Sequence, residues 1–388
     1  MSETNPLPIH PFLGDAGGYA EPDHPNLLLL SCCLAGAAVF IVPPIWIFAP
    51  PDAQLFGAGW TTVRLLASIW GVITVLLLIA GGLLGDYFGR RRFLLLGLTL
   101  FVVAHGLLFW ANAFALHFAL RILAQASGAL ILPLALAPLY IFYQGKDRVR
   151  AFAWYAFATT MASVLAAYLG SLFLHAFNWH FSYLLPGLLA LIALVLIFFT
   201  LPESYIRERR NPSAIAYAGG ALIVLALISG IVQIGIMPGW TGPVLIVMAV
   251  TGSIGIALLL WWEVRTPERR LSDFSLKVRD LVMLIAIGVI LQLILMGVFQ
   301  PIFRYFNVVK EMGLWLRILA IAPLFIGMYV GIRLVGRLWR WASVRRVFVF
   351  GLLTVAASTA LLAIRPASMP YWFQLFPLLL FGFAIQST

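Results

Sequence analysis

The chain has 388 residues, of which 63% are hydrophobic and 10% charged, and its formal net charge is +11. About a quarter of the residues of a soluble domain are charged, so this composition excludes a protein that faces water on all sides. The sequence also contains no phosphate-binding loop, metal-ligand cluster or catalytic triad. We therefore expect neither an enzyme nor a bound cofactor or metal, and the missing phosphate loop argues against an ATP-driven pump.

Lipid must be the main solvent of such a chain, and in lipid only helices and closed barrels satisfy the backbone internally. Long apolar runs such as 281–298 reach the roughly 18 residues of a spanning helix, and they lack the alternating polarity of barrel strands. The predicted fold class is all-α, a polytopic bundle of transmembrane helices.

Residues 1–25 contain no Lys or Arg and are rich in Pro, Gly and acidic residues, which predicts a disordered tail and no signal peptide. About twelve candidate spans follow, separated after the sixth by the polar segment 202–213. Their predicted ranges are 26–49, 62–84, 93–112, 116–143, 151–175, 181–201, 215–237, 244–263, 280–303, 314–335, 346–364 and 371–388.

Basic residues gather in alternate loops between these spans, with 19 of the 25 Lys and Arg on one side of the membrane. Cytoplasmic loops carry an excess of Lys and Arg, so the N-terminus is predicted to be cytoplasmic. The positive charge then reflects membrane topology, and no nucleic-acid partner is expected. We predict a multi-pass protein of a bacterial inner membrane, in contact with lipid.

The segment from Gly82 to Arg92 (GLLGDYFGRRR) joins the second and third predicted spans. Its glycines allow close helix packing, and its carboxylate is followed by three cations that face the anionic leaflet. The segment resembles the signature loop of the major facilitator superfamily, in which the aspartate and arginines form a charge relay at the cytoplasmic gate. The alternative is a basic turn with a helix-capping aspartate. The gate residues that the resemblance implies are Gly82, Gly85, Asp86, Gly89, Arg90, Arg91 and Arg92.

Arg121 lies inside the fourth predicted span, in a segment (LRILAQASGALILP, 120–133) that resembles the span-four motif of the same family. An intramembrane guanidinium is costly and usually functional, so Arg121 is a candidate for the substrate or coupling site. The alternative is an arginine that extends to the outer headgroups. The glutamine position of the family is Ala124 here. Gln125, a further candidate for that site, follows one residue later, about 100° around the helix.

Three further segments, 148–151 (RVRA), 178–183 (NWHFSY) and 201–204 (LPES), also resemble this family. With two spans inserted between the halves, the chain resembles the drug:proton antiporters that have fourteen helices, here without the last two. The resemblance implies a substrate cavity between two bundles. The expected division is a six-helix bundle at 26–201, a linker with two inserted helices at 202–279 and an incomplete bundle of four helices at 280–388.

A proton-coupled mechanism normally needs a titratable group near the midplane, yet none of the 14 acidic residues falls in the middle of a predicted span. His105, in the third span, is therefore a candidate for proton exchange, with hydrogen-bonded packing as the alternative. In the ninth span Gln292, Gln300 and Arg304 are candidates to line a cavity, with hydrogen bonding between helices as the alternative.

The resemblance implies a secondary active transporter that moves a small amphipathic solute or drug by alternating access. The first hypothesis is proton-coupled export of the kind that confers drug resistance. The antiporters that the chain resembles usually have an aspartate in the first span, whereas residues 27–49 here contain no charge. This difference favours the second hypothesis, a facilitator or symporter of another small solute. The end of the sequence at Thr388, with no polar tail, favours the third, a degraded, non-transporting member that acts as a membrane scaffold.

Overall fold

The computed structural model describes residues 24–42, 88–176, 179–203, 312–341, 344–363 and 372–387, with isolated positions at 22, 74, 77, 78, 81, 82, 84, 85, 305 and 306. Over this part of the chain the secondary structure is helical, without strands. The elements are α1 (Pro25–Phe40), α5 (Arg90–Leu108), α6 (Phe114–Phe142), α7 (Gly145–Ala176), η1 (Trp179–Tyr183), α8 (Leu184–Thr200), α12 (Leu314–Trp341), α13 (Val344–Ala363) and α14 (Trp372–Ser387).

The described helices have the length and apolar character that spanning a membrane requires. Four segments are both long and apolar enough to cross: Arg90–Leu108, Phe114–Phe142, Gly145–Ala166 and His180–Thr200. Shorter apolar stretches occur in α1, α12, α13 and α14. The predicted all-α polytopic fold is thus confirmed. The spans predicted at 215–237, 244–263 and 280–303, and most of the span predicted at 62–84, lie outside the described residues.

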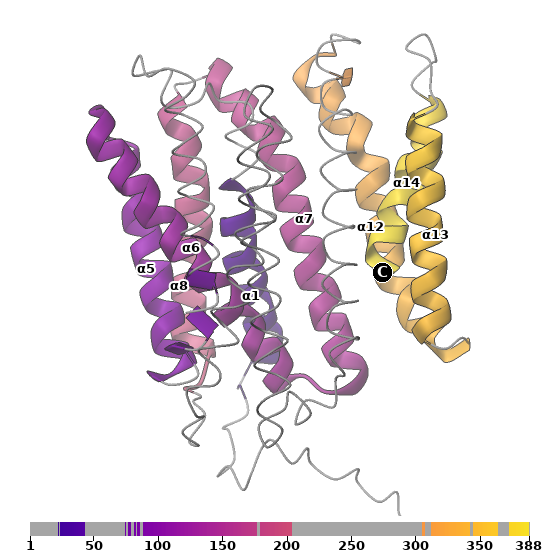
Figure 1. The fold of residues 1–388 in the computed structure, drawn as a ribbon, viewed down its shortest axis with the longest axis horizontal. Coiled ribbons are helices and arrows are strands. Elements are labelled where there is room, and N and C mark those ends of the chain that lie inside the picture. The colour runs from indigo at the N-terminus through magenta and orange to yellow at the C-terminus, as the bar shows by residue number, and fades with distance from the viewer. Residues whose placement is uncertain are drawn as a thin grey trace, which may run out of the picture.

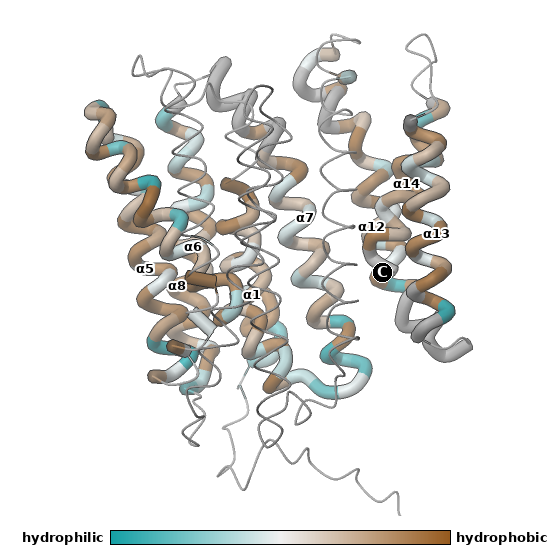
Figure 2. Tube along the Cα trace, in the orientation of Figure 1, coloured by the Kyte–Doolittle hydropathy of each residue, from teal (hydrophilic) through white to brown (hydrophobic). Residues whose placement is uncertain are grey.

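The helices form two groups that meet along α7 (Figure 1). The N-terminal group contains α1, α5, α6, α7 and α8, and the C-terminal group contains α12, α13 and α14. Hydrophobic residues run along both groups, and hydrophilic residues collect at the lower ends of the N-terminal helices (Figure 2). The division of the whole chain at 201 and 280 stays a prediction, because the residues between the two groups lie outside the described part.

α7 and α12 pack against each other in opposite directions. The rings of Trp154 on α7 and Tyr329 on α12 meet edge to face, with 6.4 Å between their centroids. Further along α7, Val164 joins an apolar cluster with Ala320 of α12 and Phe381 of α14. Because the residue numbers rise on α7 while they fall on α12, the two helices are antiparallel along this seam.

α12 and α14 approach so closely that glycine is required on both. A Cβ atom built on Gly327 would overlap the carbonyl oxygen of Leu379, and one on Gly382 would overlap the carbonyl oxygen of Leu324. Small residues at such crossings let two backbones come into contact where no hydrophobic effect drives association in lipid. Each glycine therefore packs directly against the backbone of the other helix. These two contacts set the distance between α12 and α14.

We predict that Gly327→Ala lowers the thermal transition of the purified protein, because the added methyl group must push two backbones apart. Overpacking of this kind costs roughly 1–3 kcal/mol of unfolding free energy. Gly106→Ala in α5 is the matched control, since a Cβ there would meet no atom within 4 Å. Equal transitions for both variants, measured by fluorescence in detergent, would refute the close approach.

Candidate functional site

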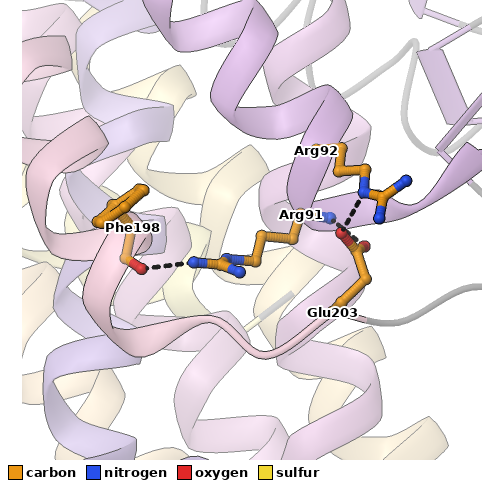
Figure 3. Close-up of polar contacts among 4 residues, drawn as sticks. All are labelled: Arg91, Arg92, Phe198 and Glu203. Carbon is orange, nitrogen blue, oxygen red and sulfur yellow. Dashed lines mark hydrogen bonds and ion pairs between the residues drawn. The ribbon is translucent and has the colours of Figure 1, made fainter.

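The start of α5 and the exit from α8 form a polar junction at one end of the N-terminal group (Figure 3). The carboxylate of Glu203 accepts a hydrogen bond from the backbone N–H of Arg91, with 3.2 Å between the atoms. Its other oxygen lies 3.4 Å from Nε of Arg92. The first N–H groups of a helix have no partner within the helix and carry partial positive charge. Glu203 therefore caps α5 from a segment 112 residues away in sequence.

Gly89 makes this junction possible. Its φ of 112° lies in a region that other residues rarely adopt. A Cβ atom at this position would also lie 2.7 Å from Oε1 of Glu203. The glycine is therefore required twice, once for the turn into α5 and once for access of the carboxylate to the helix end.

Arg91 holds the end of α8 by a second route. Its guanidinium donates a hydrogen bond of 2.8 Å to the carbonyl oxygen of Phe198 and lies 5.5 Å from the centroid of the Phe198 ring. The last carbonyl groups of a helix carry partial negative charge, so a cation beside them is favourable. α5 and α8 are thus joined by complementary contacts, a carboxylate at the start of one and a cation near the end of the other.

The other gate-loop glycines lie against α6. A Cβ on Gly85 would overlap the side chain of Leu134, and one on Gly82 would come within 3.9 Å of Pro133. Arg90 begins α5. Asp86, the carboxylate of the expected relay, lies outside the described residues.

A similar cation closes the turn between α6 and α7. Arg148 donates a hydrogen bond of 2.8 Å from Nε to the carbonyl oxygen of Tyr143 and stacks 4.2 Å from the centroid of the Tyr140 ring. Tyr143 in turn donates its hydroxyl hydrogen to the carbonyl oxygen of Pro25. Asp147 and Arg150 form an exposed pair, with 3.1 Å between their charged atoms. The RVRA segment therefore ties the α6–α7 turn to the start of α1.

At the opposite end of the same helices, α5, α6 and η1 enclose several polar side chains. Arg121 on α6 is 2% exposed and His105 on α5 is 0% exposed. Nδ1 of His105 lies 2.9 Å from the carbonyl oxygen of Phe101, one turn back on the same helix. Arg121 is therefore enclosed within the N-terminal group, which differs from an arginine that extends to the headgroups.

The side chain of Gln125 is less buried than that of Ala124, the residue before it. Ala124 is 2% exposed and belongs to the apolar cluster of α5, α6 and η1, whereas Gln125 is half-buried. The rotation expected from the one-residue offset is thus present. Gln292, Gln300 and Arg304 lie outside the described residues, so their assignment to a cavity stays a prediction.

A comparison with the sequence profiles of protein families identifies the superfamily of this chain. The sequence profile of the Major Facilitator Superfamily matches residues 28–388. The chain belongs to the major facilitator superfamily.

Individual relatives are distant. The quinolone resistance protein NorB of Staphylococcus aureus (strain JH9) is 26% identical over 166 residues, which cover 41% of this chain and 36% of NorB. The matched segment thus spans about a third of the length of that relative. Another strain of the same species, Newman, has a NorB that matches to the same extent.

Solved structures share the fold. A crystal structure of the human organic anion transporter MFSD10 superposes with a TM-score of 0.57 and 17% identity, covering 93% of this chain and 83% of that one. A crystal structure of tetrameric PepTSo2 gives a TM-score of 0.54 and 13% identity, covering 92% of this chain and 82% of that one. At these identities the likeness concerns the major facilitator fold alone.

Sequence reasoning found the segments of this superfamily member but missed several contacts. It picked out LPES as an exit signature without expecting Glu203 to cap α5 through Arg91. It also missed His117 and Tyr183, whose polar atoms pair across α6 and η1. The available signal was His117 one helical turn before Arg121, a spacing that places the two on one face.

We predict that Gly89→Ala destabilises the protein more than Gly145→Ala. Gly145 also has positive φ, 51°, but a Cβ there would meet nothing within 4 Å, so its variant bears only the backbone cost of roughly 1–2 kcal/mol. The Gly89 variant bears that cost and also displaces Glu203. Thermal unfolding of the two purified variants measures the difference, and equal losses would show that Glu203 does not depend on the glycine.

Proposed function

We propose that this chain works as a secondary active transporter that exports a small amphipathic solute or drug by alternating access, in exchange for protons. Membership of the superfamily supports transport, and the likeness to a quinolone resistance protein supports an amphipathic drug as solute. The observation that carries the proposal is the junction of Arg91, Arg92 and Glu203. It links the gate-loop motif to the exit of α8 at the end where a cytoplasmic gate is expected.

The arrangement of the helices agrees with this role. Among the described helices the two groups meet where α7 packs against α12 and α14, and groups joined in this way can rock against each other about a central site. The basic starts of α5 and α7 lie at one end of the N-terminal group (Figure 1), which supports a cytoplasmic position for that end. The N-terminus would then be cytoplasmic too, with lipid around the bundle.

One observation favours a facilitator or symporter as the second candidate. The two acidic residues that the structure describes, Asp147 and Glu203, both lie at helix ends and are paired with arginines. Neither is placed to carry a proton across the membrane, so proton coupling would require another group. His105 is our candidate for that group, and Arg121 and Gln125 on α6 are our candidates for solute contact.

The direct test uses the purified chain in lipid vesicles and a fluorescent quinolone as probe. Proton-driven export predicts that an imposed pH gradient accumulates the quinolone and that an uncoupler abolishes the accumulation. Movement of the probe at the same rate with and without the gradient would instead support a facilitator. Empty vesicles prepared from the same lipid provide the background.

We further predict that Asp86→Asn impairs quinolone transport without loss of membrane insertion, because the relay at the cytoplasmic gate needs the charge. Glu203→Gln should impair it as well, since the neutral amide cannot pair with Arg92. Gly106→Ala serves as the control with unchanged surroundings. Unchanged transport rates for both charge variants would count against the gate assignment.

A further inference from the structure

The end of the N-terminal group that faces away from Glu203 encloses a buried pair of polar residues. The hydroxyl oxygen of Tyr183 in η1 lies 3.2 Å from Nε2 of His117 on α6, and the two rings meet edge to face at 5.5 Å. His117 is 2% exposed and Tyr183 is 3% exposed. A phenol and an imidazole in this arrangement share one hydrogen, because either group can act as donor or acceptor.

Two further polar residues lie one helical turn deeper. Arg121 follows His117 by four residues on α6, which is about 6 Å along the same face. Gly187 follows Tyr183 by four residues into α8, and a Cβ built on it would lie 3.2 Å from Cβ of His105. The pair of His117 and Tyr183 is therefore stacked above His105 and Arg121, toward the membrane surface.

One imidazole nitrogen of His105 makes a hydrogen bond, whereas the other has no hydrogen-bond partner among the described residues. Nδ1 faces the carbonyl oxygen of Phe101, which can only accept, so Nδ1 carries the hydrogen. Nε2 then presents a lone pair, and it is buried without a hydrogen-bond partner within the described structure. A buried acceptor left unpaired costs roughly 1–3 kcal/mol, so its retention calls for a reason other than stability.

A third imidazole lies at the surface end of this column. His180 in η1 is half-buried, and its ring contacts that of Phe109 at the end of α5, with 6.3 Å between centroids. The order from surface to interior is His180, then His117 with Tyr183, then His105. Among the described side chains at this end, Arg121 is the charged group beside these imidazoles. The helix α8 contributes no ionisable side chain.

We propose that His117 and Tyr183 relay protons between the membrane surface at His180 and the buried Nε2 of His105, so that imidazoles exchange the protons that drive transport. This inference rests on the proposed proton-driven export and names its coupling groups. A proton taken from water adds to an imidazole nitrogen, passes through the shared hydrogen of Tyr183 and His117, and is later returned to water. Only N–H and O–H bonds form and break.

The test separates coupling from solute movement in the same vesicles. Exchange of radiolabelled quinolone at equal pH on both sides requires no net proton transfer, whereas accumulation driven by a pH gradient does. Tyr183→Phe removes the shared hydroxyl and keeps the ring, and His117→Gln removes the titratable group. We expect both variants to keep exchange within about twofold of the parent and to lose gradient-driven accumulation by about tenfold or more. A positioned proton-transfer group typically contributes roughly 10²–10⁴-fold, so this threshold is a lower bound.

Ser127→Ala is the matched control on α6. Ser127 is 1% exposed like His117, but its hydroxyl bonds only to carbonyl oxygens of its own helix, Leu123 and Ala124. The control should retain both activities. Melting temperature measured on each variant identifies loss of folding, and Tyr183→Phe keeps the packing if His117→Gln does not fold.

The outcomes are distinguishable. If Tyr183→Phe and His117→Gln lose exchange and accumulation in equal proportion, or lose neither, the relay is wrong while export stands. If the parent chain exchanges quinolone but accumulates none under a pH gradient, proton-driven export is wrong and the relay falls with it. If the parent moves no quinolone in either assay, the proposed substrate class is overturned and so is the relay.

Discussion

The carboxylate of Glu203 above the first turn of α5 is the interaction on which the N-terminal group depends most. Helix ends in a bundle leave backbone groups without partners, and at the membrane boundary water satisfies them only in part. Here one acid satisfies the N–H of Arg91 and neutralises Arg92, while Arg91 reaches back to the last turn of α8. Three contacts that cross between α5 and α8 therefore hold together the ends of two helices.

Close packing joins the described helices both between the two groups and within the C-terminal group. α7 carries both Trp154 and Val164 onto the C-terminal helices, and Gly327 with Gly382 brings α12 and α14 into backbone contact. In lipid no hydrophobic effect drives helices together. Complementary shapes and glycines that allow close approach of two backbones stabilise the contact instead. In the proposed alternating access, the described contacts of α7 with α12 and α14 lie where the two halves would move against each other.

Much of the fold could be predicted from the sequence because long apolar runs identify membrane helices. The apolar runs predicted the ends of α5, α6 and α8 to within four residues and those of α7 to within six, and the spacing of Gly82 to Arg92 predicted the family. The role of Glu203 could not be predicted from the sequence. Its contact with Arg91 joins segments distant in sequence and depends on the direction of the chain after α8. His117 and Tyr183 escaped for the same reason: neither belongs to a local motif, and only packing brings them together.

We have proposed proton exchange on imidazoles at one end of the N-terminal group and a charge-paired gate at the other. The most direct measurement is the proton flux that a quinolone elicits in vesicles containing the purified chain and an internal pH dye, with no gradient imposed. The account predicts that quinolone moving in one direction drives protons in the other, in a fixed ratio and only with protein present. Quinolone entry with no change in internal pH beyond that of empty vesicles would contradict it.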